Sequence, residues 1–252
     1  NGMVVIPESD GDRYAPITTF EHLYFSLDGR IPPVVNYLEK KGFAKPSPIQ
    51  AQCWPPLIDG RDVVGIAKTG SGKTLAFLVP AILKIARAAA SNKREEQQGG
   101  HNTAHPPILV VAPTRELAMQ SHEVAEEVGA LRSVCIYGGV PKHHQRQALR
   151  AGVDIVIATP GRLMDLMEEG SLSLAGVMYL VLDEADRMLD EGFEPVIRKI
   201  IGQCPRPESQ AQGAGAAVFR QTLMFSATWP EEVRKLAESF MGSDIVRVVV
   251  GG

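Results

Sequence analysis

The sequence predicts an α/β protein with a doubly wound parallel sheet of about seven strands and helices on both faces. Seven short runs of apolar, mostly β-branched residues recur along the chain, and segments with helical patterns separate them. Strands that are apolar along their whole length are buried on both faces, and their alternation with helices is typical of parallel sheets. We expect strands at residues 63–67, 108–113, 134–138, 154–160, 179–184, 222–228 and 245–250.

Residues 1–57 precede the first strand and are expected to form an N-terminal flank. Two helices are predicted there, around residues 30–41 and 47–57, and they should pack on the core built by residues 58–252. Inside that domain, residues 91–107 and 204–217 are rich in Gly, Pro, Gln, Ala and charge, without periodicity. We interpret these two segments as mobile surface loops that carry no chemistry.

The composition is that of an ordinary globular protein, because 44% of the 252 residues are hydrophobic and 22% are charged. No apolar run approaches the roughly 20 residues of a membrane-spanning helix, and the N-terminal residues lack the pattern of a signal peptide. We therefore expect a soluble, intracellular protein without membrane contact, for which nucleus, nucleolus and cytoplasm all fit. A monomer is a separate expectation. The net charge of -3 means that any binding of nucleic acid must use a local patch.

Cysteines and histidines give no sign of a metal site. The three cysteines are far apart and lack CxxC spacing, so we expect reduced thiols. Four histidines lie in polar segments without the cysteine or carboxylate neighbours of a metal site, so we expect their side chains to be solvated. These histidines are His101, His105, His143 and His144.

A phosphate-binding loop follows the first predicted strand. The segment "AKTGSGKT" lies between the strand "VVGIA" and the apolar helical pattern "LAFLVPAIL". In such a P-loop, backbone N–H groups and the helix N-terminus bind phosphate, lysine adds a charge and the Ser/Thr hydroxyl can ligate Mg²⁺. Alanine replaces the first glycine of the general pattern. The predicted phosphate-binding residues are Ala67, Lys68, Thr69, Gly70, Ser71, Gly72, Lys73 and Thr74.

Three acidic residues, Asp183, Glu184 and Asp186, directly follow the predicted strand at 179–184. Carboxylates so close repel one another and are costly to desolvate, so they need a cation, basic partners or open water. A nucleotide with Mg²⁺ on the P-loop supplies that cation. We therefore predict that Asp183 holds the metal together with Thr74, and that Glu184 orients and deprotonates the attacking water. The predicted catalytic residues are Lys73, Asp183 and Glu184.

Polar motifs follow the ends of nearly all the predicted strands. Ligands of open parallel sheets bind beyond the carboxyl ends of the strands, so these motifs should meet at one edge. Taken in order, they resemble the first RecA-like domain of the DEAD-box RNA helicases over residues 20–250. The motifs are "PSPIQ" (46–50), "AKTGSGKT" (67–74), "PTREL" (113–117), "GG" (138–139), "TPGR" (159–162), "DEAD" (183–186) and "SAT" (226–228).

This resemblance implies a RecA-like P-loop NTPase that uses ATP and Mg²⁺ to remodel or locally unwind RNA. In the family the glutamine of the "PSPIQ" motif recognises adenine, which assigns that role to Gln50. An amide can donate and accept together, as the N6 and N7 edge of adenine requires, so ATP should be preferred over GTP. An upstream aromatic stacks on the base. The family spacing, seventeen residues before Gly42, indicates Phe25, with Phe20 as the alternative.

The resemblance also implies an RNA surface and a coupling element. Phosphates and the 2′-OH are bound through backbone N–H groups, hydroxyls and arginines, with little sequence specificity. The implied RNA-binding residues are Pro113, Thr114, Arg115, Gly138, Gly139, Thr159, Pro160, Gly161 and Arg162. For coupling of hydrolysis to strand separation, Ser226 and Thr228 are expected to hydrogen-bond the acidic cluster, with Asp186 as the favoured acceptor.

A complete family member has a second RecA-like domain with an "HRxGRxxR" element, which does not occur in these 252 residues. An arginine finger of this kind contributes a factor of about 10³ to 10⁵ in rate. We therefore expect the second domain as a partner and little ATP turnover from this chain alone. Two other functions remain open at this point: a noncatalytic RNA or protein clamp, and a DNA translocase or DEAH-type helicase. Gln50 and Asp186 disfavour the last of these.

Overall fold

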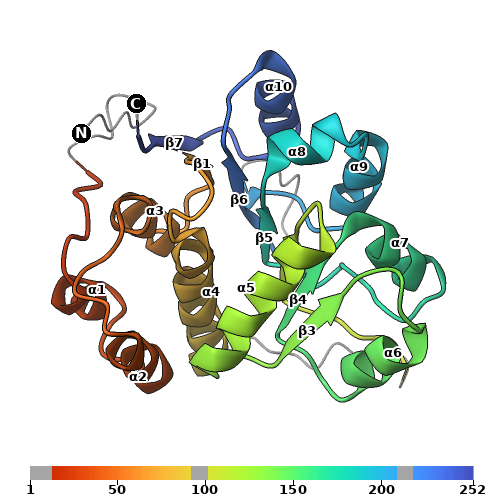
Figure 1. Cartoon of the computed structure of the whole chain (residues 1–252), viewed down its shortest axis with the longest axis horizontal. Helices are drawn as coiled ribbons and strands as arrows, with labels where there is room; N and C mark the ends of the chain where they lie inside the picture. The colour runs from red at the N-terminus through yellow and green to blue at the C-terminus, as the bar shows by residue number, and fades with distance from the viewer. Residues whose placement is uncertain (1–12, 92–101, 209–217, 252) are drawn as a thin grey trace.

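Seven strands form one parallel sheet at the centre of the molecule (Figure 1), as predicted. The computed structural model describes residues 13–91, 102–208 and 218–251. The strand order is β3-β4-β2-β5-β6-β1-β7, and neighbouring strands pair in parallel. The strands are β1 (Val63–Ile66), β2 (Ile108–Val111), β3 (Ser133–Ile136), β4 (Ile155–Ala158), β5 (Tyr179–Leu182), β6 (Gln221–Ser226) and β7 (Val246–Val249).

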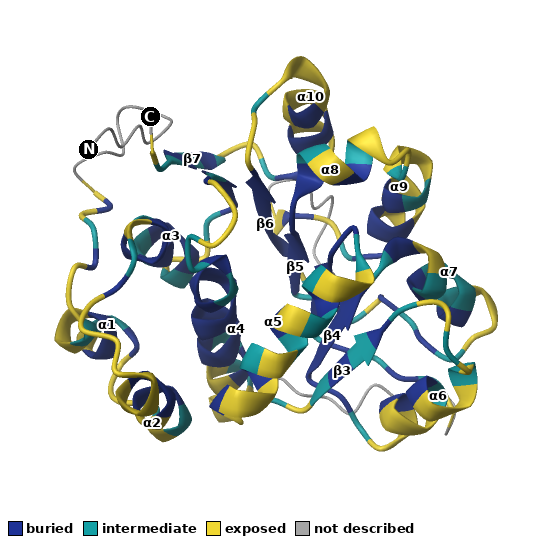
Figure 2. Cartoon of the chain, in the orientation of Figure 1, coloured by how far each residue is buried: buried dark blue, intermediate teal, exposed yellow. Residues whose placement is uncertain are grey.

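The central strands are buried on both faces, and this explains their unbroken apolar sequences (Figure 2). Two hydrophobic clusters lie on opposite sides of the sheet. One contains residues of α1 (Phe20–Ser26), α2 (Pro32–Lys41), α3 (Pro48–Ile58), α4 (Lys73–Ala90) and α5 (Arg115–Val128). The other contains residues of α6 (Lys142–Arg150), α7 (Pro160–Glu168), α8 (Ala185–Asp190), α9 (Glu194–Gly202) and α10 (Glu231–Phe240).

The N-terminal flank is helical and packed on the first cluster. Helices α2 and α3 confirm the two predicted helices, and Trp54 of α3 donates from Nε1 to the carbonyl of Leu75 at 3.2 Å. Helix α1 was not predicted. It begins after Thr19, whose hydroxyl accepts a hydrogen bond from the backbone N–H of His22 at 3.1 Å. The flank thereby brings the start of α3 against the start of α4.

The two polar segments are partly anchored in the fold. Ala104 pairs with Leu172 in an isolated bridge, and both ring nitrogens of His105 are buried, so the prediction of a solvated His105 is wrong. Cys204, two residues beyond the end of α9, is buried, so the second segment does not start at the surface. His143 and His144 are exposed as predicted. His101 and residues 92–101 and 209–217 lie outside the described residues.

All three cysteines are free thiols: Cys53 and Cys204 are buried and Cys135 is half-buried. Among the residues that the structure describes, no group of three or more His, Cys, Asp or Glu side chains could hold a metal. Within the same residues, no helix is long and apolar enough to cross a membrane.

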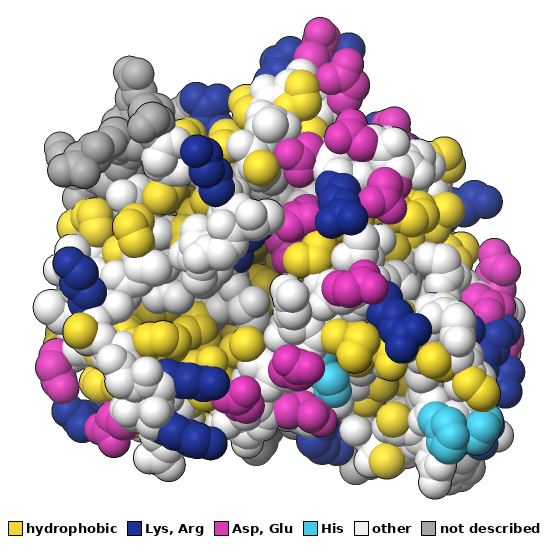
Figure 3. Space-filling view, in the orientation of Figure 1, with side chains coloured by type: hydrophobic (Ala, Val, Ile, Leu, Met, Phe, Trp, Pro, Cys, Tyr) yellow, Lys and Arg dark blue, Asp and Glu magenta, His cyan; other side chains and the backbone are white. Residues whose placement is uncertain are grey.

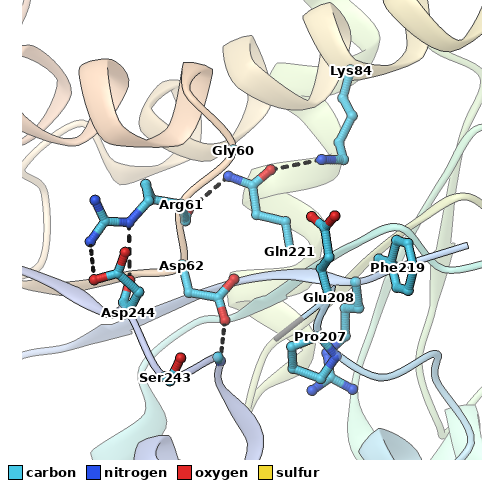
Figure 4. Close-up of a pocket in the computed structure, with 12 residues that line it drawn as sticks. Gly60, Arg61, Asp62, Lys84, Pro207, Glu208, Phe219, Gln221, Ser243 and Asp244 are labelled. Carbon is cyan, nitrogen blue, oxygen red and sulfur yellow. Dashed lines mark hydrogen bonds and ion pairs between the residues drawn. The ribbon is translucent and has the colours of Figure 1, made fainter. Parts of the chain in front are cut away.

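A polar cluster closes the amino end of the sheet, opposite the predicted site (Figure 4). The carboxylate of Asp62, just before β1, accepts from the backbone N–H groups of Thr222 at 2.8 Å and Gly242 at 2.6 Å. Lys84 donates to Gln221 Oε1 at 2.9 Å. These contacts tie β1, β6, α4 and the loop before β7 together, and so hold β1 in the register that presents the P-loop.

Candidate nucleotide-binding and catalytic site

The P-loop joins the end of β1 to the start of α4, the context predicted from the sequence. The chain turns through Gly70 and Gly72, whose φ angles are +76° and +87°, a conformation that only glycine adopts without strain. The N–H of Ala67 donates to the carbonyl of Ser226 at 3.1 Å, which fixes the loop to β6. The α4 N-terminus therefore lies in the position expected for phosphate binding.

Lys73 and Asp183 meet at the carboxyl edge of the sheet. Lys73 Nζ lies 3.6 Å from Asp183 Oδ1, and both side chains are buried. Neither atom has a hydrogen-bond partner among the described residues. Burial raises the pKa of Asp183, and this effect outweighs the nearby Lys73 ammonium, which lowers that pKa. The pair is thus a buried, incompletely satisfied set of charges, which is typical of a ligand site.

Glu184 has a left-handed backbone with φ of +51°, a rare conformation for a residue with a side chain. It stands at the start of α8, is 7% exposed, and its Oε2 lies 3.7 Å from Arg187 Nη1. Backbone outliers of this kind persist where surrounding structure holds them, and they gather at functional sites. The turn follows β5 directly, because the N–H of Asp183 still bonds the carbonyl of Val111.

Gln50 is buried against the P-loop. Its Nε2 donates to the carbonyl of Gly72 at 3.1 Å, and its Oε1 accepts from the N–H of Ser47 at 2.9 Å. Ser47 in turn donates from Oγ to the carbonyl of Ser71 at 2.8 Å. A side-chain amide has two donor hydrogens and two acceptor lone pairs. One donor and one acceptor position of Gln50 therefore remain for a ligand.

These groups surround a pocket of about 310 Å³. It brings together Gln50, the P-loop turn, Lys73, Thr74, Asp183 and Glu184, whereas Ala67, Lys68 and Ser71 are not among the residues of its wall. Helix α5 supplies one wall that the sequence did not indicate. The lining residues are Tyr37, Phe43, Gln50, Thr69, Gly70, Gly72, Lys73, Thr74, Leu75, Leu117, Gln120, Ser121, Val124, Asp183 and Glu184.

The structure does not place Phe25 in this pocket. Phe25 lies on α1 and is 84% exposed, and the alternative, Phe20, packs against the core. Phe43 lines the pocket instead, is 47% exposed, and contacts Tyr37 edge-on with ring centroids 6.4 Å apart. A sequence signal for Phe43 exists: it directly follows Gly42, which ends α2 in a left-handed cap, and it lies in the short loop that leads to Gln50.

Thr228 contacts Asp186 as predicted, whereas Ser226 does not. Asp186 Oδ2 accepts from Thr228 Oγ1 at 2.9 Å and from its N–H at 3.2 Å. The hydroxyl of Ser226 is fully buried and has no hydrogen-bond partner among the described residues. The difference follows from position: Ser226 is the last residue of β6, inside the sheet, and Thr228 lies in the loop beyond it.

The three predicted RNA-contact motifs lie on neighbouring strand ends and are linked to one another. Arg115 at the start of α5 stacks over the ring of Tyr137, with its guanidinium carbon 4.7 Å from the centroid. Tyr137 precedes the exposed turn Gly138–Gly139, and Gly139 has a φ of +83°. Thr114 caps α5 by accepting from the N–H of Leu117 at 3.3 Å.

Arg162 makes hydrogen bonds within the protein that the sequence did not predict. Its Nη1 donates to the carbonyl of Val140 at 3.0 Å and to Gln145 Oε1 at 3.3 Å, and its side chain is 11% exposed. Gln145 donates from Nε2 to the carbonyl of Tyr137 at 3.0 Å. Arg162 and Gln145 therefore hold both ends of the glycine turn. Thr159, Pro160 and Gly161 begin α7 beside them.

A comparison with protein families identifies this arrangement. A family model described as DEAD/DEAH box helicase matches residues 47–236, from the capping serine of α3 to α10. The chain belongs to this family. The matched range includes the P-loop, the acidic motif and the three strand-end motifs described above.

Curated relatives and a solved structure agree with the family assignment. The chain is 50% identical to DEAD-box ATP-dependent RNA helicase 5 of Arabidopsis thaliana, over 84% of this chain and 37% of that protein. It is 47% identical to ATP-dependent RNA helicase DBP3 of Chaetomium globosum, over 98% of this chain and 41% of that protein. The chain thus spans about two fifths of these relatives' length.

Among solved structures, the fold is similar to that of the yeast DEAD-box splicing factor Prp28. The TM-score is 0.78 at 33% sequence identity, and the match covers 96% of this chain and 55% of the Prp28 chain. The predicted RecA-like doubly wound fold is therefore confirmed.

Proposed function

We propose that the chain is the ATP-binding domain of an ATP-dependent RNA helicase, which binds ATP with Mg²⁺ and the RNA backbone. The observation that carries the proposal is the buried pair Lys73–Asp183, 3.6 Å apart, with orphaned polar atoms facing the P-loop pocket. Phosphates on the α4 N-terminus give Lys73 its missing acceptors. With a second RecA-like domain in the same protein, the domain remodels or locally unwinds RNA.

In this proposal the base of ATP lies between the Gln50 amide and the ring of Phe43. Gln50 keeps one free donor and one free acceptor position beside its bonds to Gly72 and Ser47. That combination matches the N7 acceptor and N6 donor of adenine and not the N7 and O6 acceptors of guanine. The half-exposed Phe43 offers a ring face for stacking.

The residues fit a magnesium ion bound with the nucleotide. Asp183 Oδ1 has no hydrogen-bond partner among the described residues although Lys73 Nζ lies 3.6 Å away, and Thr74 Oγ1 lies at the α4 start, 3.5 Å from Ser121 Oγ. Mg²⁺ in nucleotide sites uses one or two protein oxygens plus phosphates, so a larger carboxylate cluster is unnecessary. Thr74 and Asp183 would hold the ion, which offsets the charge of the phosphates. Glu184 accepts the proton of the attacking water.

RNA binding is proposed for the surface formed by the strand-end motifs. The exposed Gly138–Gly139 turn and Gly161 present backbone N–H groups without side chains, and Arg115 is exposed above Tyr137. Such contacts recognise the backbone and not the base sequence. Arg162 serves mainly to shape this surface, because its Nη1 is bonded to Val140 and Gln145.

Binding of nucleotides to the purified chain tests the proposal. With Mg²⁺ present, ATP is expected to bind at least tenfold more tightly than GTP, and Gln50→Glu should reduce that preference because it removes the amide donor. Gln147→Ala, an exposed substitution on α6, serves as the control. Equal affinities for ATP and GTP would count against the assignment.

The class of nucleic acid requires a separate measurement. A single-stranded RNA oligonucleotide should bind more tightly than DNA of the same sequence when ATP and Mg²⁺ are present, because the contacts include the 2′-OH. A preference for DNA would indicate a translocase instead. Turnover of ATP by the chain alone is expected to be slow, since no arginine finger occurs in its sequence.

A further inference from the structure

Strand β3 is an edge of the sheet, because among the described strands it pairs with β4 alone. On that side the carbonyls of Arg132 and Ile136 accept from the N–H groups of Ile155 and Thr159. Backbone groups of a strand alternate between its two edges. Ser133 and Cys135 therefore direct their N–H and C=O groups away from β4, and no hydrogen bond joins these groups to another described residue.

A groove runs along this open edge between α5 and α6. Its volume is about 580 Å³. Its floor and walls combine β3 with the apolar side chains of Met119, Tyr137, Val140 and Ala148. Ser133, Val134 and Cys135 all line the groove, so this edge of the sheet can be reached from solvent between the two helices. The groove thus offers a second strand both hydrogen-bonding groups and apolar contacts.

The charged side chains that line the groove are acidic, and the guanidinium of Arg115 stacks over Tyr137, one of the lining residues. Helix α5 contributes Glu123 and Glu126, both exposed, and Figure 3 shows acidic side chains beside a histidine in the region between α5 and β3. Helix α6 contributes His144 and the buried Gln145, and none of the Lys and Arg residues that the structure describes is part of the groove wall.

The remaining polar groups of the groove are held within the protein. His122 Nδ1 bonds Ser133 Oγ at 2.8 Å, and its Nε2 lies 3.4 Å from Glu126. Burial raises the pKa of the Cys135 thiol to about 11, so the thiol adds no charge.

We propose that the open edge of β3 binds an extended, basic segment of a partner protein, which adds to the sheet as an eighth strand. Ser133 and Cys135 supply the four backbone groups of the pairing, as in other cases of β-strand addition. Alternate side chains of the segment point to opposite faces. Those on the α5 side meet Glu123 and Glu126 and are basic, and those on the α6 side meet Val140 and Ala148 and are apolar.

Synthetic heptapeptides of alternating lysine and valine, blocked at both ends, test the proposal. The lysine–valine peptide should shift the backbone amide resonances of Ser133 and Cys135 and slow their hydrogen exchange. It should also bind at least tenfold more tightly than the glutamate–valine peptide of the same length. Unchanged amide resonances at β3 with saturating peptide would overturn the proposal.

N-methylated peptides separate strand addition from simple charge attraction. Methylation of alternate amides blocks one edge of an extended peptide and leaves its charges in place. Methylation at one of the two alternating sets should weaken binding at least tenfold, and methylation at the other set should have little effect. Equal binding of both methylated peptides would overturn the proposal.

Protein variants provide a matched comparison. Cys135→Pro removes the outward N–H group without removing a bond to β4, and should abolish peptide binding, whereas Cys135→Ala should retain it. Glu123→Gln combined with Glu126→Gln should weaken binding, and Glu116→Gln, outside the groove, should not. If the proline variant fails to fold, binding of the N-methylated peptides to the wild-type protein tests the strand addition instead. Dimerisation of the free protein through β3 would assign the edge to a second copy and overturn the proposal.

Discussion

Gln50 donates from Nε2 to the carbonyl oxygen of Gly72 at 3.1 Å, so the residue predicted to recognise adenine and the loop predicted to bind phosphate form one unit. Ser47 strengthens the connection through its bond to Ser71. A substitution in the P-loop turn should therefore change the position of Gln50 and weaken binding of the base. A substitution of Gln50 should likewise change the P-loop turn.

Gly72→Ala tests this connection. Gly72 has a φ of +87°, and a Cβ there would lie 2.6 Å from Gln50 Nε2 and 2.7 Å from Ser47 Oγ. The left-handed backbone alone costs about 1–2 kcal/mol for a residue with a side chain. We expect a loss of stability of at least that size in urea unfolding, and ATP binding weakened tenfold or more. Gly202→Ala, where a Cβ meets nothing within 4 Å, is the control.

Phe43→Ala should weaken ATP binding. Stacking of a base on an aromatic ring contributes about 1–3 kcal/mol, which corresponds to roughly 5- to 150-fold in affinity. Phe25→Ala should leave affinity unchanged, because Phe25 is 84% exposed on α1 and does not line the pocket. Phe43→Trp should restore most of the binding. The opposite result, with Phe25 sensitive and Phe43 neutral, would return the stacking role to Phe25.

The seven strands could be predicted because each is a run of apolar residues buried on both faces, a pattern that few other structures produce. The P-loop and the acidic motif could be predicted because spacing along the chain determines their local geometry. Helix α1 was missed because it is only seven residues long, with Leu23 and Tyr24 as its buried residues. Such a short segment shows too little periodicity to separate it from a loop.

The parts of the site that were not predicted depend on contacts between distant segments. Phe43 was missed because the path of the loop after α2 decides which ring reaches the pocket. The partners of Arg162 come from α6 and the glycine turn, 17 and 22 residues away. A sequence motif predicts the type of a residue and the strand end at which it lies. It does not predict whether the side chain already makes hydrogen bonds within the protein, as Arg162 does.

Ser226 and Thr228 should respond differently to removal of their hydroxyls. Ser226→Ala removes a buried hydroxyl without a hydrogen-bond partner among the described residues, so the free energy of unfolding should stay constant or rise. Thr228→Val removes the bond from the hydroxyl to Asp186, leaves the bond from the backbone N–H, and should cost about 0.5–1.5 kcal/mol. Urea unfolding of both variants measures the contrast. A larger loss for Ser226→Ala would mean that its hydroxyl has a partner in solution.

Stability should depend on pH through Asp183. Its pKa is raised by burial in the folded protein, above the value of about 3.9 in the unfolded chain. Such a group contributes its full stability below the unfolded pKa and loses it as pH rises through the raised folded pKa. Asp183→Asn cannot titrate. The free energy of unfolding of the ligand-free wild type, relative to this variant, should therefore fall as pH rises from about 4.

Urea unfolding of both proteins between about pH 4.5 and pH 8 measures that difference, because titrating groups far from Asp183 contribute alike to both proteins. With saturating ATP and Mg²⁺ the loss should shrink, because the carboxylate of Asp183 then faces a metal cation in addition to Lys73. A wild type that gains stability relative to Asp183→Asn as pH rises would show that Lys73, 3.6 Å away, outweighs burial. In that case the carboxylate would be satisfied without a ligand, and the main physical argument for a cation at this site would fail.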